Sequence, residues 1–369
     1  MVKRGLATLQ KNSDKINIMN ELQDICIDKN LTILNAIERM NKINRKLLIL
    51  TERNKFYSLV SIGDIQRAIL SKIDLETPVC DITRKDIRVA LDTDNMEKVK
   101  ERMRIKRNEF MPVISKNNEI VDVIFWNELF DHEEQKRPYS LNLPVVIMAG
   151  GTGSRLKPIT NILPKPLIPL GEKTIMEEIM DKFVNAGCSN FLISVNYKAE
   201  MIVNYFDTLK NYNYHIEYFK EDKPLGTAGS MFLIRDKIKS TFFVSNCDII
   251  IDQDLEELYK YHKQNGNKIT IVSVLKNYYI PYGTIETENG GILKELFEKP
   301  KLTFQINSGM YILEPEVLYE IPENKFFHIT ELIEKVKKNR SRIGVFPVNE
   351  GSWKDIGDWN EYLKNAKNE

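Results

Sequence analysis

Two kinds of hydrophobic pattern divide the chain. From residue 144 onward, short continuous apolar runs alternate with segments whose apolar residues recur every three or four positions. Continuous runs are typical of buried parallel strands, and the three-to-four spacing is typical of amphipathic helices. Residues 144–150, for example, read PVVIMAG, and residues 174–186 place Ile175, Ile179 and Phe183 on one helix face. The alternation predicts an α/β domain with a Rossmann-like mixed, mainly parallel sheet.

A different pattern, which occurs twice, precedes this domain. A helical spacing at residues 30–40 is followed by two apolar runs at 46–50 and 56–62 and by a helix at 64–70. The same order returns with a helix at 96–103, runs at 110–114 and 120–126, and a helix that starts at 127 or 128. This duplication predicts a smaller α+β unit. We expect it to span residues 1–136, with a polar linker at 137–143 and the α/β domain at 144–369.

The balance of charged residues limits the classes of binding partner that the sequence predicts. The 369 residues include 53 Lys and Arg and 52 Asp and Glu, so the net charge is +1. A balanced charge gives no general electrostatic basis for nucleic-acid binding. No apolar run reaches the roughly 18–20 residues of a membrane helix, and the first residues lack a secretory apolar region. The four Cys show no C-x-x-C, and the four His show no metal-ligand spacing, so we expect a cytoplasmic protein with reduced thiols and no zinc site.

The most informative segment follows the first strand of the α/β domain. It reads MAGGTGSRLKPITNILPKPLIPLGEK, from residue 148 to residue 173. Gly150, Gly151 and Gly153 allow a close approach of backbone N–H groups to an anion. The glycine spacing matches neither a Walker A loop nor the dinucleotide fingerprint. Arg155 adds a planar cationic fork and Lys165 a compact positive charge, and both suit a polyphosphate.

This segment resembles the signature of sugar-1-phosphate nucleotidyltransferases. The motif G-G-x-G-[ST]-R-L-x-P-x-T is followed by P-K-P-L, and the similarity extends over about residues 144–360. The resemblance implies that Arg155 and Lys165 are catalytic and bind the triphosphate and the charge that develops on it. It also implies that the backbone at Ala149 and at the three glycines of the loop binds the nucleotide.

A second matching segment concerns the nucleoside. P-L-G-T-A-G at residues 224–229 resembles the part of the family that closes over the base, and this assigns Gly226 and Thr227 to nucleotide binding. Glu221 lies where the family reads the edge of the base. A carboxylate there could accept from both N–H groups of guanine, which favours GTP. A solvated surface glutamate is the alternative interpretation of Glu221.

Two aspartates are candidates for a magnesium site. Asp248 ends the apolar run FFVSNCD, and the carboxyl ends of parallel strands are where such sheets bind ligands. Asp355 lies in W-K-D-I-G, which resembles the second metal position of the family. Mg²⁺ is typically held by one or two carboxylates together with substrate phosphates and water. Each aspartate could instead be an ordinary turn residue.

Three weaker matches concern the sugar phosphate. They are P-Y-G-T-I with Gly283, F-E-K-P with Glu298 and Lys299, and I-N-S-G-M-Y with Asn307. The resemblance implies that these residues bind the sugar and its phosphate. The alternative is that they are scaffolding of a hairpin, which the sequence predicts to turn at Asn289–Gly290.

The duplicated first segment resembles a pair of CBS domains. The sequence S-I-G-D-I puts Ser61 and Asp64 where that family contacts a nucleotide ribose. In the second copy the matching positions are Phe125 and Glu128, so a second nucleotide site is not expected. Asp64 could instead be a helix N-cap. A CBS pair would bind a regulatory nucleotide or hold two subunits together, and we expect a homo-oligomer.

These resemblances predict an enzyme of nucleotide-sugar biosynthesis. It would transfer a nucleoside monophosphate from an NTP, with GTP favoured, to a hexose 1-phosphate such as glucosamine 1-phosphate, for surface glycans. No general base is needed, since a phosphate monoester has a second pKa of about 6. The alternatives are a thymidylyl- or uridylyltransferase, a non-catalytic nucleotide or nucleotide-sugar sensor subunit, and a dinucleotide oxidoreductase.

Overall fold

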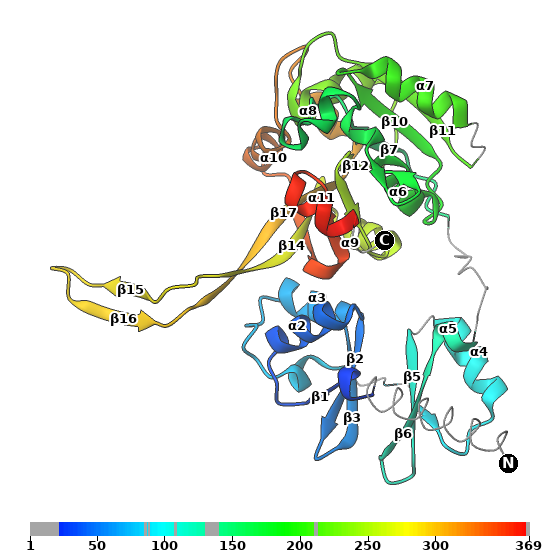
Figure 1. Cartoon of the computed structure of the whole chain (residues 1–369), viewed down its shortest axis with the longest axis vertical. Coiled ribbons are helices and arrows are strands. Elements are labelled where there is room, and N and C mark those ends of the chain that lie inside the picture. Colours follow the sequence, from blue (N-terminus) through cyan, green and yellow to red (C-terminus); the bar gives the residue numbers. More distant parts are fainter. Residues whose placement is uncertain are drawn as a thin grey trace. The chain divides into compact units, whose positions relative to one another are not determined.

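The computed structural model describes residues 22–84, 87, 89–106, 109–129, 140–209 and 213–366. The chain separates into two compact units, residues 1–136 and residues 137–369, and each is described by itself (Figure 1). The expected linker at 137–143 lies partly outside the described residues.

The first unit contains the expected duplication. Its first half consists of β1 (Cys26–Asp28), α2 (Ile33–Ile43), β2 (Leu47–Glu52), β3 (Lys55–Ser61) and α3 (Ile62–Leu70). Its second half consists of β4 (Ala90–Leu91), α4 (Met96–Lys106), β5 (Phe110–Ile114), β6 (Ile120–Phe125) and α5 (Trp126–Leu129). In both halves the first two strands are parallel and the last two antiparallel. The halves share a core in which the rings of Phe110 and Phe125 lie 5.8 Å apart.

A seven-stranded sheet forms the centre of the second unit. Its strands are β7 (Val145–Met148), β10 (Asn190–Val195), β11 (His215–Lys220), β12 (Phe242–Asn246), β14 (Ile269–Tyr279), β17 (Lys301–Leu313) and β18 (Ile343–Asn349). Their order is β11-β10-β7-β12-β17-β14-β18, and only the two pairings that involve β17 are antiparallel. The predicted mainly parallel sheet is therefore confirmed.

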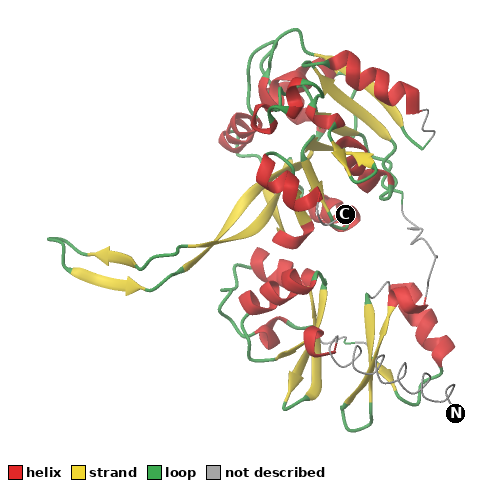
Figure 2. Cartoon of the chain, viewed as in Figure 1, coloured by secondary structure: helices red, strands yellow, loops and turns green. Residues whose placement is uncertain are grey.

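Helices cover both faces of this sheet (Figure 2). One face packs against α6 (Ile175–Val184), α7 (Ala199–Leu209) and α9 (Leu255–Gln264). The other face packs against 3₁₀ helices at Ser230–Ile234 and Pro315–Glu320 and against α10 (Ile329–Lys338). Adjacent residues of β7 pack into different cores: Ile147 belongs to the core on the first face and Val146 to the core on the second. Such alternation follows from the period of two along a strand.

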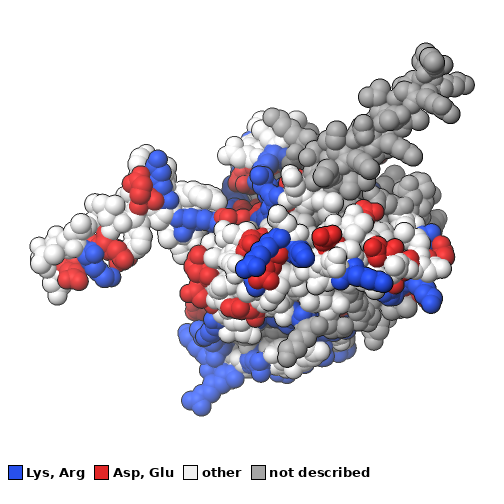
Figure 3. Space-filling view, turned by 90° about the horizontal axis from the view of Figure 1, so that it is seen from below, with Lys and Arg blue, Asp and Glu red and all other residues white. Residues whose placement is uncertain are grey.

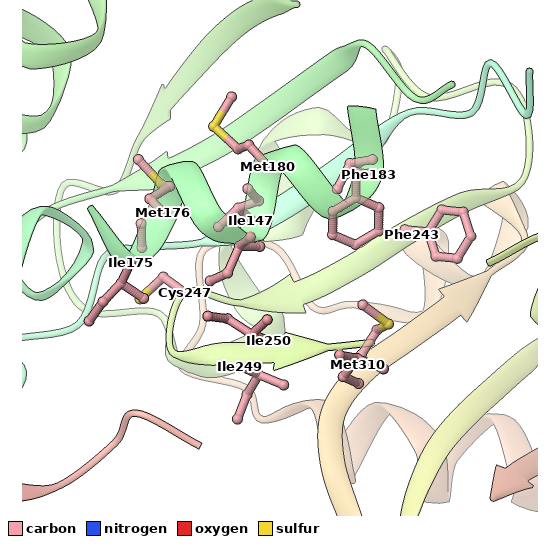
Figure 4. Packing of buried hydrophobic residues seen from close by; sticks show 14 of the residues in the cluster. Ile147, Ile175, Met176, Met180, Phe183, Phe243, Cys247, Ile249, Ile250 and Met310 are labelled. Atoms are coloured by element: carbon pink, nitrogen blue, oxygen red, sulfur yellow. The ribbon is translucent and has the colours of Figure 1, made fainter. Parts of the chain in front are cut away.

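Helix α6 illustrates how the sequence builds this packing. Thr174 is its N-cap and forms a capping box with Glu177, which satisfies backbone N–H groups of the first turn. Met176, Met180 and Phe183 then point to the sheet, where Phe183 meets Phe243 at a ring distance of 5.4 Å (Figure 4). This buried layer fixes the strand ends from which the site is built.

Shorter elements complete the second unit. They are β8 (Pro169–Leu170), β9 (Lys173–Thr174), α8 (Gly226–Gly229), β13 (Ile249–Ile251), β15 (Thr284–Thr287), β16 (Leu293–Phe297), β19 (Trp353–Asp355) and α11 (Trp359–Ala366). The hairpin of β15 and β16 turns through Gly290 and Gly291, which both have positive φ, at the place that the sequence predicts. No helix among the described residues combines the length and apolar character needed to cross a membrane.

Candidate active site

The candidate site lies at a change of direction in the strand order. From β7 the chain adds β10 and β11 on one side and then returns to place β12 on the other side. The loops after β7 and β12 therefore separate at the carboxyl edge of the sheet, where open α/β sheets bind ligands. A cavity of about 410 Å³ opens there. Its lining combines loop glycines, cations and acids: Met148, Gly150, Gly151, Gly153, Ser154, Arg155, Lys165, Glu221, Pro224, Gly226, Thr227, Asn246, Cys247, Asp248, Phe326, His328 and Gly357.

The loop after β7 forms one wall of this cavity. Gly153 has a φ of +63°, and a Cβ there would lie 2.8 Å from Cγ2 of Thr160 and 3.2 Å from Cβ of Lys165. Gly151 is different, because a Cβ there would meet no atom within 4 Å. Gly151 therefore leaves room beside the cavity, whereas Gly153 makes the tight turn that the loop requires. Ala149 is 1% exposed and belongs to the core, so only its backbone is close to the loop.

The two cations predicted from the loop lie at the same end of the cavity. Lys165 is buried, and its Nζ donates to Oδ2 of Asp248. Arg155 follows the glycine turn, and its Nη2 would lie 3.1 Å from a Cβ placed on Gly357. The same Cβ would lie 2.6 Å from Oδ1 of Asp355. Arg155 and Asp355 thus approach the same point, next to the pair of Lys165 and Asp248.

A short antiparallel ladder brings the two aspartates together. β13 pairs with β19 so that Ile249 lies opposite Asp355, and the Ile356 N–H donates to the Asp248 carbonyl at 2.8 Å. Asp355 does not itself line the cavity, but its neighbour Gly357 does, and the Gly357 N–H donates to Oδ1 of Asp355 at 2.7 Å. Burial raises the pKa of Asp355 above its ordinary value of 3.8, and the charge of Asp248 raises it further. Two neighbouring carboxylates at one edge of a cavity are the oxygen donors that Mg²⁺ prefers.

Glu221 is buried rather than solvated, with an exposed fraction of 6%. Its Oε1 accepts from the Ser194 hydroxyl, and its Oε2 accepts from the Leu225 N–H at 2.9 Å. The carboxylate therefore positions the segment that begins at Pro224. The alternative of a solvated surface glutamate is wrong, because the side chain lies between Ser194 and the backbone of Gly150, where a Cβ would be 2.7 Å from Oε1.

The segment at 224–229 rests on residues a hundred positions further along the chain. Gly226 has a φ of +79°, and a Cβ there would lie 2.7 Å from the Phe327 carbonyl oxygen. That carbonyl accepts from Ala228 and Gly229 N–H groups, both at 3.0 Å. Thr227 Oγ1 in turn accepts from the Ile329 N–H at 3.0 Å. The two segments are therefore held together at one end of the cavity.

Several lining residues have no role in the sequence prediction, among them Asn246, Phe326 and His328. Phe326 and His328 reach the cavity from the loop before α10, with their rings 4.7 Å apart in an edge-to-face arrangement. Asn246, at the end of β12, lies against Gly309. Of these three, only Asn246 could have been found from the sequence, because it is the polar residue that ends a buried apolar strand. No local pattern connects Phe326 and His328 with a motif a hundred residues earlier.

The residues predicted for the sugar phosphate do not line this cavity. Gly283, Glu298 and Lys299 lie at the base of the β15–β16 hairpin, where a Cβ on Gly283 would be 3.1 Å from Oε2 of Glu298. Asn307 lies on β17, and its side chain accepts from the Gly309 N–H at 3.1 Å and donates to the Tyr311 hydroxyl at 2.8 Å.

Ser61 and Asp64 belong to the first unit. Ser61 is the N-cap of α3, and Asp64 is the third helical residue of the same capping box. The motif therefore caps a helix, but the N-cap is Ser61 and not Asp64. Asp64 is 3% exposed and forms ion pairs with Arg67 and Arg84. The Arg84 guanidinium also donates to the Ser61 hydroxyl at 2.9 Å. A buried acid held by two arginines is a polar cluster at a helix start.

Comparison with known proteins assigns the second unit to a family. Residues 144–369 match the family model described as nucleotidyl transferase. The chain belongs to this family. The resemblance seen in the glycine-rich loop is thereby confirmed, and the predicted CBS pair stays a prediction because the match begins at residue 144.

Individual relatives agree with this assignment. The chain is 34% identical over 229 residues to a mannose-1-phosphate guanyltransferase of Saccharomyces cerevisiae, a match that covers 59% of this chain and 62% of the relative. It is also 34% identical to the mannose-1-phosphate guanyltransferase of Schizosaccharomyces pombe, over 60% of this chain and 62% of that protein. The chain thus spans less than two thirds of the length of these relatives. Among solved structures, HddC from Yersinia pseudotuberculosis has a TM-score of 0.50 at 26% identity, covering 61% of this chain and 99% of HddC.

Proposed function

We propose that the second unit transfers a nucleoside monophosphate from an NTP to a hexose 1-phosphate, forming a nucleotide sugar and pyrophosphate. The observation that supports this reaction most directly is the convergence of the glycine loop, Arg155, Lys165 and Asp248 on one cavity. Asp355 lies next to this lining, beside Gly357. The family of the chain and the names of its relatives support the same reaction.

In this reaction an oxygen of the sugar phosphate attacks the α-phosphorus of the NTP. A new phosphorus–oxygen bond forms as the bond from the α-phosphorus to the bridging oxygen breaks, and pyrophosphate leaves with its electron pair. The sugar phosphate is largely a dianion near pH 7, so no protein group has to remove a proton. Catalysis then depends on alignment and charge stabilisation. Lys165 would neutralise charge at the α-phosphate, and Arg155 with the loop N–H groups would hold the outer phosphates.

The acidic end of the cavity fits a divalent metal ion, for which we propose Mg²⁺. Asp248 and Asp355 would hold it together with phosphate oxygens, and the ion would supply positive charge to the polyphosphate. Burial is the main cause of the raised pKa of Asp355, and the charge of Asp248 adds to it. A cation bound by both carboxylates would offset this second contribution. No group of three or more acidic, His or Cys ligands occurs among the residues that the structure describes. The proposed ion would therefore be bound tightly only together with the nucleotide.

The nucleoside would lie at the opposite end, beside residues 224–229. We propose GTP as the donor, which agrees with the guanyltransferase names of the relatives. Each carboxylate oxygen of Glu221 accepts one hydrogen bond from the protein and keeps a second lone pair for a donor on the base. Those names also make mannose 1-phosphate the first acceptor to test, with glucosamine 1-phosphate as the second.

A substrate panel tests this function. The full chain is incubated with Mg²⁺, each of four NTPs and each of several hexose 1-phosphates, and pyrophosphate release is measured. We expect turnover that is highest with GTP. Arg155→Ala and Lys165→Ala should each reduce kcat by about 10²–10³-fold, the usual effect of removing one preorganised donor. Nucleotide binding without turnover for every acceptor would instead indicate a non-catalytic sensor and reject the proposal.

For the first unit we propose a nucleotide site at Ser61 and Asp64 that modulates the rate. The buried carboxylate and the adjoining Arg84 support a ligand that carries both hydroxyl and phosphate groups. Titration of adenine and guanine nucleotides into the full-length enzyme should change the rate, and Ser61→Ala should weaken that effect. If the rate is insensitive to every nucleotide, a scaffolding role in subunit association remains for this unit.

A further inference from the structure

A lysine outside the cavity contacts the loop that carries the proposed catalytic cations. Lys198 lies between β10 and α7, and it is not among the residues that line the cavity. Its Nζ donates to three consecutive backbone carbonyls, those of Thr160 at 3.4 Å, Asn161 at 2.6 Å and Ile162 at 2.7 Å. An ammonium group has three N–H donors, so this segment uses all of them. Lys198 therefore keeps no donor for a substrate phosphate.

These carbonyls lie where the backbone supplies few donors. Ile159–Asn161 form a short 3₁₀ helix, and the last carbonyls of a helix have no N–H partner within it. Pro164, which follows shortly after, has no N–H group. On the face of the molecule shown in Figure 3, many basic side chains project from the surface next to acidic ones. Lys198 differs from such lysines, because it is half-buried and its Nζ donates to main-chain carbonyls.

The backbone at Lys198 is unusual for a residue with a side chain. Its φ is +53°, in the left-handed region that L side chains rarely adopt. Strained positions of this kind persist only where the surrounding contacts fix them, and they cluster at functional sites. The neighbouring Tyr197 adds such a contact, because its hydroxyl donates to the Thr160 carbonyl at 3.2 Å. Its ring centre lies 5.3 Å from the Lys198 ammonium. Two adjacent side chains thus hold the same segment.

Thr160 connects this anchor with the glycine turn. It is 1% exposed, and its hydroxyl donates to the Gly153 carbonyl at 3.0 Å. Its Cγ2 fills the space that a Cβ on Gly153 would need. Along the chain, Thr160 lies midway between Arg155 and Lys165. A displacement of Thr160 would therefore move the segments that carry both cations.

The other end of the same turn contacts the nucleoside end of the cavity. Asn196 donates from its Nδ2 to the Glu221 carbonyl at 2.8 Å. Its Cβ would lie 3.4 Å from a Cβ placed on Gly150. Residues 196–198 are therefore in contact with both ends of the cavity wall, although none of them lines the cavity. Such a turn can set the spacing between the groups that hold the base and those that hold the phosphates.

We propose that Lys198 is a positioning residue, through which the turn 196–198 holds the glycine loop at the distance from the nucleoside end that a triphosphate requires. The anchoring of the loop follows from the contacts of Lys198 alone, whereas its effect on catalysis rests on the proposed function. Without the ammonium, the loop would stay folded but would visit positions in which Arg155 and Lys165 are displaced from the phosphates. A displacement of about 1 Å can reduce a rate by roughly 10²-fold.

Hydrogen exchange on the full chain tests the anchoring without any substrate. Lys198→Met keeps most of the side-chain length and removes the donors, so we expect the amides of residues 159–163 to exchange about tenfold faster or more. Lys335→Met is the matched control, since the Lys335 Nζ donates at 2.7 Å to the last carbonyl of another 3₁₀ helix, Pro315–Glu320, which does not line the cavity. It should leave exchange at 159–163 unchanged. An unchanged rate there in Lys198→Met, or an equal acceleration in β12, would overturn the proposal.

Nucleotides of different length test the effect on the site. Calorimetry measures the affinities of the full chain for guanosine and for GTP with Mg²⁺, and pyrophosphate release measures kcat. For Lys198→Met we expect kcat to fall about 10²-fold and the affinity for GTP about tenfold, because the cations are displaced from the phosphates. The affinity for guanosine should stay unchanged, since Glu221 and residues 224–229 keep their contacts. Lys335→Met should match the wild type in all three quantities.

Two results would overturn the positioning role. A general loss of structure would lower the affinities for guanosine and GTP in parallel, whereas a displaced loop affects only GTP. A parallel loss, or a Lys198→Met variant as active as the wild type, would therefore reject the role of Lys198 in catalysis. If the wild type binds no nucleotide and converts no substrate pair, the proposed function fails, and the exchange measurement still decides whether Lys198 holds the loop.

Discussion

Substituting alanine for Gly151 separates ligand contact from loop folding. A Cβ at Gly151 meets no protein atom within 4 Å, and this residue is not among the glycines with positive φ. The free energy of unfolding should therefore change by no more than about 0.5 kcal/mol. The added methyl would instead occupy space next to the bound polyphosphate. Since a misplacement of about 1 Å can reduce a rate by roughly 10²-fold, we expect kcat/KM to fall by about that factor.

Two other glycines serve as controls for this substitution. Gly153→Ala combines a left-handed backbone, which costs about 1–2 kcal/mol, with close contacts to Thr160 and Lys165, so it should lower both stability and activity. Gly266→Ala isolates the backbone cost, because Gly266 has a φ of +60° and a Cβ there meets nothing within 4 Å. It should lower stability by about 1–2 kcal/mol and leave kcat/KM unchanged. Urea unfolding and pyrophosphate release measure the two quantities. A Gly151→Ala variant as active as wild type would refute the assignment of the loop to the polyphosphate.

Three further predictions follow from the surroundings of single side chains. Asp355 has a raised pKa, so the folded protein binds its proton more tightly than the unfolded chain, and ionisation lowers stability as pH rises above 3.8. In the absence of metal, Asp355→Asn should raise Tm near pH 7, and this gain should disappear as the pH falls toward 3.8. The same variant should no longer be stabilised by Mg²⁺ together with GTP. An unchanged Tm near pH 7 would contradict this reasoning. Glu221→Gln leaves one hydrogen-bond donor, of Ser194 or Leu225, without an acceptor, so stability should fall by about 1–3 kcal/mol in urea unfolding and KM for GTP should rise. Burial raises the pKa of the Cys247 thiol to about 12, so iodoacetamide should not modify this residue in the folded protein at pH 8, as peptide mass spectrometry would show.

Much of the catalytic end could be predicted from the sequence because its residues lie in one continuous segment or directly after strands. Gly150, Gly153 and Arg155 follow β7, and Asp248 follows β12. A polar residue at the end of a buried strand must emerge at the edge of the sheet, whatever the details of packing. The predicted position of these residues therefore depends only on recognising two strands.

The nucleoside end was harder to predict because tertiary contacts decide its backbone. The backbone is α-helical only briefly here, since α8 spans Gly226–Gly229 and continues as a 3₁₀ helix, Ser230–Ile234. Two glycines in four residues weaken the helix, and the Phe327 carbonyl takes the N–H groups of Ala228 and Gly229. The same contact brings Phe326 and His328 to the cavity. Local propensity contains no information about this pairing.

The proposed metal site shows why spacing alone could not give its geometry. Asp248 and Asp355 meet because Ile249 lies opposite Asp355 in the ladder of β13 with β19. A shift of that ladder by one residue would turn Asp355 to the other face and place Lys354 on the face toward Asp248. A Lys beside Asp248 would add a second cation to the pair with Lys165 and would remove the carboxylate donor. The chemistry of this edge is therefore set by register, which β13 and β19 acquire from the buried contacts of Ile249, Ile250 and Ile251 in the core.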